Sequence, residues 1–410
     1  MGKMSRFLLS VVVFLVVSFS SVSFAGEIDI LVEKLIAKGI LTPVEGQVIL
    51  EETKQEVTKK IAQGKSYAVP EWVQNTKLKG DLRLRYQWED PTDAIDRSRE
   101  RYRLRLGVES KINDNMKVHA GIASGSNDPR STNETLDDTF ETKGAMLDYA
   151  YAEWLAAPWA TVKAGKIQGV KNCLFTTSDL LWDGDINPEG VSLLLNKKIG
   201  NLELFANAGY WILDEWSASA HDPSMYVIQP GFKYKFNGNT HLKAGVACYN
   251  FENIVGNSQL EHSSATNTTT GGKLKYSYNS INPNIEFGMK QPLNGLVPYA
   301  AIFGEYVVNP DRSEANEGYL CGVKFGAEKV KKLHDWQFKY MYRELEKDAW
   351  LDTFPDSDAM GGGTDIKCHE LVLAYGLGKN TALGLDYYYG DSIGGVEAHH
   401  IFQVDWTLKF

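Results

Sequence analysis

The chain has 410 residues, of which 43% are hydrophobic and 23% are charged, and this composition excludes a disordered chain and a bundle of membrane-spanning helices. Its mean hydropathy of −0.29 still allows a membrane barrel, whose strands hide apolar residues at every second position. A net charge of −9 leaves no excess of positive charge to neutralise phosphates, which argues against nucleic acid as a partner.

The first residues have the pattern of a secretory signal peptide. Lys3 and Arg6 precede an apolar run, Phe7–Phe19, which is followed by Ser23-Phe24-Ala25. A basic start, a short apolar run and small residues at −3 and −1 predict cleavage directly after this tripeptide. The run is shorter than the about 20 apolar residues of a spanning helix, so a membrane anchor is the weaker alternative. We therefore expect residues 1–25 to be a signal peptide.

Residues 26–70 are predicted to form a helical segment. The apolar positions Ile28, Leu31, Val32, Leu35 and Ile36 recur at helical spacing and stop at Gly39, a residue type that often ends helices. Thr42-Pro43-Val44-Glu45 has the capping-box pattern and predicts a second helix that runs to about Gly64. This pair is too small to fold alone, and we expect it in the periplasm. Self-association, packing against the rest of the chain and a passive linker stay open as its role.

From about Thr76 the apolar residues alternate with polar ones at a period of two. Leu82–Trp88 and Tyr102–Val108 have this pattern, and so do later segments of about ten residues, the length of a lipid-facing barrel strand. A soluble β-sandwich alternates too, but tyrosines and tryptophans near the strand ends favour a membrane barrel. We expect residues 71–410 to form an all-β fold, a transmembrane antiparallel β-barrel.

Short and long connections alternate along this predicted barrel. Short ones rich in Asn and Gly, which tolerate positive φ, are 113–115, 200–201, 237–239 and 378–380. Long polar ones are 89–98, 126–142, 168–189, 253–272 and 346–365. One rim of turns and one rim of loops are typical of barrels with both chain ends in the periplasm, and the segments number about sixteen. Near Asn279 to Pro283 the apolar positions switch from even to odd numbers, which suggests a β-bulge.

The last predicted strand ends on an aromatic residue. Its lipid-facing side is formed by Phe402, Val404, Trp406, Leu408 and Phe410, with polar residues between them. This ending resembles the C-terminal signature of bacterial outer-membrane proteins that the barrel-assembly machinery recognises. Together with the signal peptide, it predicts a location in the outer membrane of a Gram-negative cell.

Two stretches resemble a known family. Leu35–Pro43 and Ser178–Gly190 look like the opening and the mid-barrel loop of the bacterial outer-membrane putative porin family. The resemblance implies a general-porin-like barrel of sixteen strands, a water-filled channel for passive diffusion of small polar solutes or ions. It also implies a homotrimer surrounded by outer-membrane lipid, without a cofactor.

Two other classes of function stay open. One is a structural anchor whose N-terminal helical segment tethers the barrel to peptidoglycan or to a partner protein. The other is an outer-membrane enzyme, against which the sequence argues because it has no GxSxG, HExxH or glycine-rich phosphate motif. We therefore do not expect an enzyme.

Basic residues lie between the lipid-facing positions and should face the lumen. The expected pore-lining residues are Arg83, Arg85, Arg101, Arg103, Arg105 and Lys163. Charged walls set which ions a pore passes. In the alternative interpretation these side chains only fill the lumen and pair with acids such as Asp148.

The connection Gln168–Glu189 follows the fifth predicted strand, where general porins fold their third loop into the barrel. We expect it to form a constriction through Asp179, Trp182, Asp183, Asp185 and Glu189. Carboxylates opposite the arginines would create a transverse field that selects solutes by dipole and size. The acidic loop and the arginines favour opposite ions, so the sign of ion selectivity stays open.

Metal and disulfide chemistry is weakly indicated. The run Asp183–Glu189 offers oxygen ligands at alternate positions but lacks the spacing of a calcium-binding EF-hand. The four cysteines are widely spaced, with no CxxC pair, so we expect no metal site, and the sequence does not give a disulfide pairing.

Overall fold

The computed structural model describes residues 32, 34–62, 71–91, 95–217, 220–395 and 398–410. It divides into two units, Met1–Gln74 and Asn75–Phe410. Within the described part of the chain, no helix has both the length and the apolar character needed to cross a membrane.

The N-terminal unit contains the helices α3 (Pro43–Ala62) and α4 (Glu71–Gln74). The predicted capping box begins α3. The backbone N–H of Glu45 donates to Oγ1 of Thr42 at 3.3 Å, and the N–H of Thr42 donates to Oε2 of Glu45 at 2.9 Å. Two of the N–H groups that have no partner inside the helix are thereby satisfied.

Gly39 ends the helical turn that precedes α3. Its φ is +67°, and its N–H donates to the carbonyl of Ile36 at 2.9 Å, as expected for a glycine at the end of a helix. Ile28 and Leu31, which belong to the first predicted helix, lie outside the described residues, as does the predicted signal peptide.

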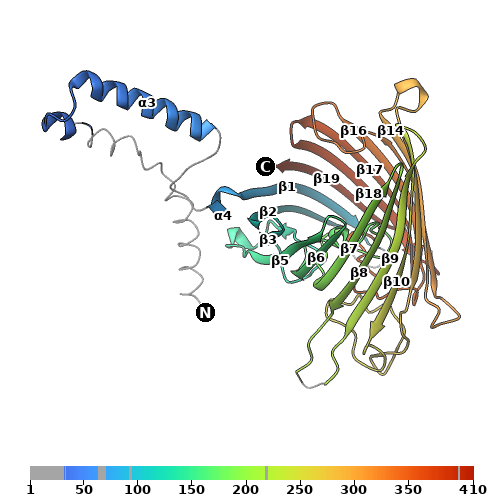
Figure 1. Cartoon of the computed structure of the whole chain (residues 1–410). Helices are drawn as coiled ribbons and strands as arrows, with labels where there is room; N and C mark the ends of the chain where they lie inside the picture. Colours follow the sequence, from blue (N-terminus) through green and yellow to red (C-terminus); the bar gives the residue numbers. More distant parts are fainter. Residues whose placement is uncertain (1–31, 33, 63–70, 92–94, 218–219, 396–397) are drawn as a thin grey trace. The chain divides into compact units, whose positions relative to one another are not determined.

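The second unit is a closed antiparallel sheet. Among the described residues this sheet has seventeen strands; because β4 (Glu134–Thr135) is a two-residue addition to β2, sixteen strands form the wall. Each strand pairs with the next wall strand, and β1 pairs with β19 to close the barrel (Figure 1). The wall strands are β1 (Thr76–Asp90), β2 (Arg97–Asn113), β3 (Met116–Ala123), β5 (Met146–Ala157), β6 (Ala160–Lys166), β7 (Glu189–Ile199), β8 (Leu202–Ile212), β9 (Ser224–Lys235), β10 (Thr240–Glu252), β13 (Ile281–Lys290), β14 (Tyr299–Val308), β15 (Glu317–Gly326), β16 (Trp336–Leu345), β17 (Ile366–Gly378), β18 (Thr381–Ser392) and β19 (His399–Lys409). The predicted fold and strand number are confirmed.

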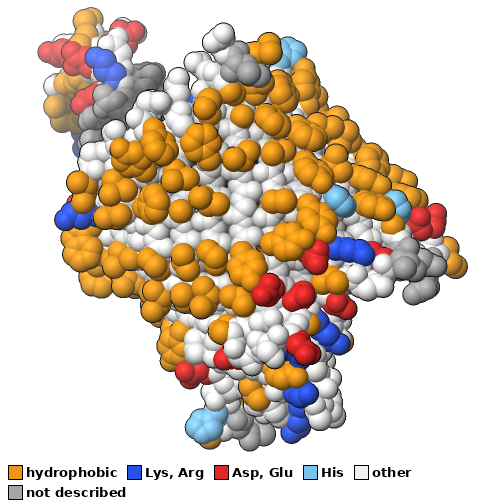
Figure 2. All heavy atoms as spheres, turned by 90° about the vertical axis from the view of Figure 1, so that its right-hand side faces the viewer, with side chains coloured by type: hydrophobic (Ala, Val, Ile, Leu, Met, Phe, Trp, Pro, Cys, Tyr) orange, Lys and Arg blue, Asp and Glu red, His pale blue; other side chains and the backbone are white. Residues whose placement is uncertain are grey.

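The wall is apolar outside and polar inside. On β1, Leu84 and Tyr86 are each 40% exposed, whereas Arg85 between them points into the lumen and is 6% exposed. Figure 2 shows hydrophobic side chains spread over the outer wall, with charged side chains gathered toward one end. Such an outer band is stable only against lipid, which explains the alternation in the sequence. Phe410 lies at the edge of this face and exchanges backbone hydrogen bonds of 2.9 and 3.0 Å with Gly80 on β1.

The two rims differ as predicted. The turns at 200–201 and 379–380 use Gly200 and Asn380 with φ of +58° and +60°. On the opposite rim, the connections 124–145, 167–188, 253–280 and 346–365 are long and fully described. They contain the 3₁₀ turns η1 (Asp138–Phe140) and η2 (Val170–Asn172) and a small hairpin of β11 (Thr269–Thr270) and β12 (Lys273–Leu274), while η3 (Leu293–Gly295) lies in a turn of the first rim.

The predicted bulge near Asn279 to Pro283 is wrong. β10 and β13 keep one register from Thr240–Met289 to Cys248–Ile281, so nothing shifts within the ladder. The change from even to odd outward positions arises in the long connection that precedes β13, where the chain leaves the wall and returns.

The cysteines form no disulfide: all four are free. Cys173 and Cys368 are buried inside, and Cys248 and Cys321 are exposed on the outer wall. Burial raises the pKa of the Cys173 thiol to about 11, so this group stays protonated and acts as a small apolar side chain.

Candidate functional site

The connection 167–188, between β6 and β7, folds into the barrel. Oε1 of Gln229 on β9 accepts the backbone N–H of Thr176 at 3.0 Å, and Oε1 of Glu305 on β14 accepts the N–H of Leu180 at 3.2 Å. The same connection contacts β2 and β16, as shown below. These strands lie on different sides of the ring, so the segment crosses the lumen.

Asp179 fixes this segment to the far wall. Its carboxylate lies 2.6 Å from Nζ of Lys339 on β16, and its carbonyl accepts a hydrogen bond from Arg343 at 3.2 Å. Burial alone would raise the pKa of Asp179, but the neighbouring charges of Lys339 and Arg343 lower it below its usual value. The carboxylate therefore stays ionised and paired.

Asp185 fixes the other end of the segment to the arginines of β2. Asp81 accepts Arg103 at 2.7 Å and Arg105 at 2.9 Å, and Arg105 also reaches Asp185 at 3.1 Å. Burial would raise the pKa of Asp185, but Arg103 and Arg105 lower it. The carboxylate of Asp185 on the acidic loop is thus in direct contact with the Arg105 guanidinium, and no open pore space separates these two groups.

The arginines of β1 are also paired. Arg85 forms ion pairs with Asp405 at 2.7 Å and with Asp358 at 2.8 Å. Arg83 lies 3.5 Å from Asp405 and donates to Asn133 at 2.6 Å. We define the arginine wall as Arg83, Arg85, Arg101, Arg103 and Arg105 on β1 and β2.

Arg101 and Lys163 complete the predicted pore-lining set. Arg101 donates to Gln87 at 3.3 Å and has no carboxylate within 4 Å among the described residues. Lys163 on β6 donates to the carbonyl of Asn172 at 2.9 Å and lies 3.7 Å from Glu153. Lys163 therefore supports the start of the inward segment.

A second connection, 346–365, lies beside the first, and sequence reasoning did not place it in the lumen. The indole N–H of Trp350 donates to the carbonyl of Leu181 at 2.9 Å. The N–H of Asp183 donates to the carbonyl of Phe354 at 2.7 Å. The aromatic residues in this otherwise polar connection could have indicated that it lies in the lumen, because large aromatic side chains are usually buried and are uncommon in a fully solvated loop.

Asp183 is buried where the two connections meet. Its carboxylate accepts the N–H groups of Ser357 at 2.9 Å and of Asp185 at 2.8 Å. Burial, together with the nearby charges of Asp356 and Asp185, raises its pKa well above the usual value. In the described part of the chain, no group of three or more His, Cys, Asp or Glu side chains could hold a metal ion.

An aromatic cluster fills the space between the connections and the wall. The ring of Trp182 lies 5.0 Å from Phe354, 5.4 Å from Trp350 and 5.8 Å from Trp211 on β8, centre to centre. All four rings are buried. Burial of such large side chains stabilises the inward position of both connections by several kcal/mol, at about 1.5–3 kcal/mol for each side chain.

The connection 253–280 is hydrogen-bonded to the connection 346–365. Asp352 accepts the N–H groups of Thr266 at 2.7 Å and Asn267 at 2.9 Å. Asp348 accepts the N–H of Thr268 at 2.9 Å and pairs with Arg312 at 2.9 Å. The loops on this rim therefore form one hydrogen-bonded layer inside the barrel mouth.

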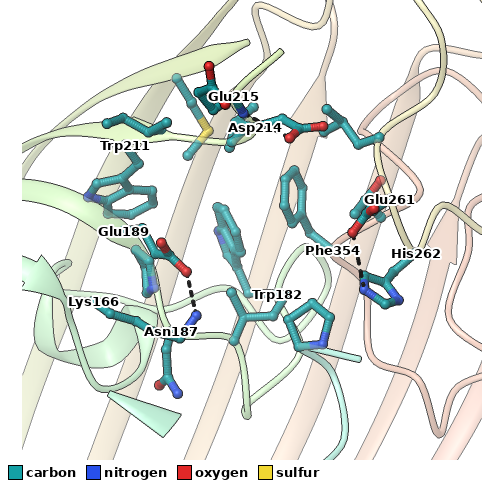
Figure 3. A pocket seen from close by; sticks show the side chains of 18 of the residues that line it. Lys166, Trp182, Asn187, Glu189, Trp211, Asp214, Glu215, Glu261, His262 and Phe354 are labelled. Atoms are coloured by element: carbon teal, nitrogen blue, oxygen red, sulfur yellow. Dashed lines mark hydrogen bonds and ion pairs between the residues drawn. The ribbon is translucent and has the colours of Figure 1, made fainter. Parts of the chain in front are cut away.

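This layer separates an outer cavity from inner ones. The outer cavity, of about 420 Å³, opens toward the long loops and is bordered by Trp182, Trp211 and Phe354 (Figure 3). Glu189, which is 60% exposed and 2.5 Å from Lys166, lies at its edge. Inner cavities of about 310 and 320 Å³ lie beneath the segment beside Asp179. Trp182 borders both sides, so the segment 167–188 and the connection 346–365 packed beside it form a partition between the cavities.

A family model described as putative porin matches residues 37–94, 88–284 and 299–410, which cover most of the chain and both loops of the partition. The chain belongs to the putative porin family. No curated protein matches this porin.

The fold has a match among solved structures. The high-pH structure of OprB from Pseudomonas putida is 10% identical, with a TM-score of 0.54, over 82% of this chain and 94% of that chain. A mutant porin of Rhodopseudomonas blastica is also 10% identical, with a TM-score of 0.44, over 82% of this chain and 100% of that chain. At this identity the likeness to OprB concerns the fold alone.

Membership of the family decides between the classes of function left open by the sequence. The porin is an outer-membrane channel for passive diffusion of small polar solutes or ions. Its family and fold are those of a channel rather than an enzyme, and nothing in the comparisons favours a structural anchor.

Proposed function

We propose that the channel prefers cations, and that the partition formed by 167–188 and 346–365 is its constriction. The observation behind this proposal is a difference in pairing between two sets of charges. The arginine wall points into the lumen, but most of its charge is compensated at close range by Asp81, Asp185, Asp358 and Asp405. A compensated charge contributes little to the field that a passing ion meets.

The charges of the outer cavity also support a preference for cations. Asp214, Glu215 and Glu261 line it, and among the described residues no Lys or Arg lies within 4 Å of their carboxylates. Lys166, the one lysine among the described residues that line it, is already paired with Glu189. A cavity with uncompensated carboxylates and low-dielectric walls concentrates cations at the mouth of the constriction.

A reversal potential in a KCl gradient tests the proposal. We expect the wild-type channel in a planar bilayer to pass K⁺ in preference to Cl⁻. The variant D214N/E215Q/E261Q should lose most of that preference with little change in fold, because these side chains line a cavity and, among the described residues, form no ion pair with a Lys or Arg. The matched control is D114N, in the turn between β2 and β3, whose side chain is 95% exposed far from the cavity. An anion preference in the wild type, or an unchanged potential in the triple variant, would contradict the proposal.

We propose further that three copies assemble through β3, β5 and β6. β6 has seven residues and β3 has eight. At a tilt of 45°, seven residues cover about 16 Å of the about 25 Å lipid band. If only lipid surrounded these short strands, its apolar chains would therefore contact the polar residues at the barrel rim. The outward side chains Ala120, Ala152 and Ala164 are small and allow a neighbouring wall to approach.

The trimer proposal is tested by native mass spectrometry of the detergent-solubilised channel. We expect a trimer for the wild type and mainly monomers for A152R. The control A206R places the same charge on the exposed outer face of β8 and should leave the trimer intact. Monomeric wild type, or equal effects of the two substitutions, would refute an interface at these strands.

We also propose that residues 1–25 are removed as a signal peptide and that residues 26–70 stay in the periplasm, apart from the barrel 71–410. The basic-apolar-small pattern and the capped helix α3 support this division. Deletion of residues 27–66 should leave single-channel conductance unchanged. A loss of conductance in correctly inserted channels would instead make this segment part of the pore.

A further inference from the structure

The lipid-facing wall is hollowed by a groove that crosses β8, β9, β10, β13 and β14. The groove has a volume of about 830 Å³ and an almost entirely apolar lining. Small residues of the outer face lie in it between larger ones. The small residues are Pro230, Ala244, Pro283 and Gly304, and the larger ones are Leu204, Phe232, Val246, Ile285 and Tyr306. Because the groove opens within the band that meets lipid, apolar groups rather than water should fill it.

Two prolines in the middle of the wall help to keep the groove open. A proline has no N–H to donate to the ladder and is rare in central strands. The pairing of β9 with β10 is interrupted beside Pro230, and that of β13 with β14 is interrupted at Pro283. The side-chain amide of Asn282 bridges the second gap by donating to the carbonyl of Tyr306 at 2.8 Å. The wall therefore gives up ladder hydrogen bonds at the place where its outer side chains are small.

The groove follows one row of cross-strand neighbours. Directly opposite residues point to the same face of a sheet. The row, in which each residue lies opposite the next, is Lys197, Leu204, Phe232, Ala244, Ile285 and Gly304.

This row leads from the short-turn rim into the hydrocarbon core. Lys197 lies two residues before the end of β7, at the short-turn rim, whereas Gly304 lies five residues after the start of β14. Five steps of about 4.8 Å cover about 24 Å, and across strands tilted by about 45° the row gains about 17 Å of depth. This depth is close to half of the about 30 Å hydrocarbon core, which is the share of one lipid leaflet.

Lys197 places a positive charge at the end of the row nearest the short-turn rim. It lies directly opposite Leu204, which is 41% exposed on the outer face, so its side chain belongs to the same face. The side chain is exposed, and among the described residues its ammonium group forms no ion pair. The next residue, Lys198, points to the inner face because side chains alternate along a strand. A cation at the edge of the hydrocarbon core attracts the phosphate of an anionic lipid.

We propose that Lys197 and the groove form a binding site for one anionic phospholipid of the leaflet at the short-turn rim. The phosphate contacts the ammonium group of Lys197, and one acyl chain lies along the row into the hydrocarbon core. The lysine alone would attract any anion, and the groove alone would accept any apolar chain. A molecule that uses both has a negative head and a long apolar tail. The site lies on the outer face, so this inference does not depend on the proposed ion preference of the channel.

Native mass spectrometry of the full-length channel tests the site. The detergent-solubilised channel is mixed with palmitoyl-oleoyl phosphatidylglycerol, which is anionic, or with the phosphatidylcholine of the same chains, which has no net charge. We expect one phosphatidylglycerol per chain, bound about fivefold more tightly than phosphatidylcholine. K197Q should remove this difference. The matched control K198Q removes the neighbouring charge from the inner face and should keep the difference.

A second pair of variants tests the groove itself. A244F fills the groove and should weaken the binding of both lipids by about tenfold. A300F adds the same ring to the outer face of β14 outside the groove and should bind both lipids like the wild type.

Each part of the proposal has its own contrary result. Equal affinity for the two lipids in the wild type, or equal losses in K197Q and K198Q, would refute Lys197 as the contact of the headgroup. Unchanged lipid binding in A244F would refute the groove as the place of the acyl chain. If A244F separates an oligomer that A300F leaves intact, the groove is an interface between copies and the lipid site is refuted. K197Q removes no packing, so its result is decisive even if A244F does not fold.

Discussion

The arginine wall and the outer cavity show two uses of charge in one lumen. Arg85 of the wall has two carboxylates within 2.8 Å and a side chain only 4% exposed, whereas Glu261 of the cavity is 85% exposed with only a histidine nearby. Paired and desolvated charges hold loops against strands, and their field is short-ranged. A carboxylate without a Lys or Arg partner leaves its field open to a passing solute. A count of arginines therefore says less about selectivity than their partners do.

The largest expected effect on conductance comes from a substitution in the aromatic cluster that holds the two connections in the lumen. Trp350→Ala removes a fully buried ring that contacts Trp182 and Phe354 and donates to Leu181. It should cost about 3–5 kcal/mol of the free energy that keeps the two connections docked, so the open-channel conductance should rise and become noisy. Single-channel recordings measure this.

The control for this substitution is Trp336→Ala, which removes a tryptophan that is 40% exposed on the outer wall. Its conductance should equal that of the wild type. A quiet, unchanged conductance in Trp350→Ala would mean that the connections stay docked without the aromatic cluster.

A smaller effect is expected from breaking one pair in the arginine wall. Arg105→Gln leaves Asp81 and Asp185 each without one partner and should lower the free energy of unfolding in urea by about 1–3 kcal/mol. Arg101→Gln, which loses only a contact with Gln87 at 3.3 Å, should lower it by less. Both substitutions remove one positive charge, so equal losses of stability would show that pairing does not distinguish the two arginines.

The smallest effect depends on pH. The folded-state pKa of Asp185 is lowered by Arg103 and Arg105, against burial, so its stabilising contribution is present above its unfolded pKa of about 4 and is lost as the pH falls through the lower folded value. The difference in unfolding free energy between wild type and D185N should be about 1 kcal/mol at pH 6 and should shrink below pH 4. A difference that grows on acidification would contradict this assignment.

The barrel wall could be predicted from the sequence because the residue pattern of each strand depends on the surroundings of its own two faces. Residues on one side of a strand meet lipid and those on the other meet water or protein, so alternation in Leu82–Trp88 already identifies the two faces. The capping box at Thr42 and Glu45 is equally local. The bulge near Asn279 was wrong because a change of parity cannot distinguish a bulge from a connection that leaves and rejoins the wall.

The partition and the cavity could be predicted only in part. The inward segment 167–188 was recognised from its place after the fifth strand, but its partner 346–365 is separated from it by half of the wall strands. Contacts such as Asp183 with Ser357, 174 residues away, leave no local pattern. Asp214, Glu215 and Glu261 look like ordinary loop acids until the fold brings them around the same rings.

The closure of the barrel between β1 and β19 has a consequence for how the chain folds. Arg85 and Asp405 meet across this seam although they are 320 positions apart. Bringing the ends of so long a loop together costs about 5 kcal/mol of chain entropy, far more than forming any hairpin between neighbouring strands. Hairpins should therefore assemble first and the β1–β19 seam last. Arg85 pairs with both Asp405 and Asp358, so its ion pairs stabilise the barrel only after the seam has formed. The ion pairs of this one buried arginine on the inner face of the wall thus stabilise the final step of barrel assembly.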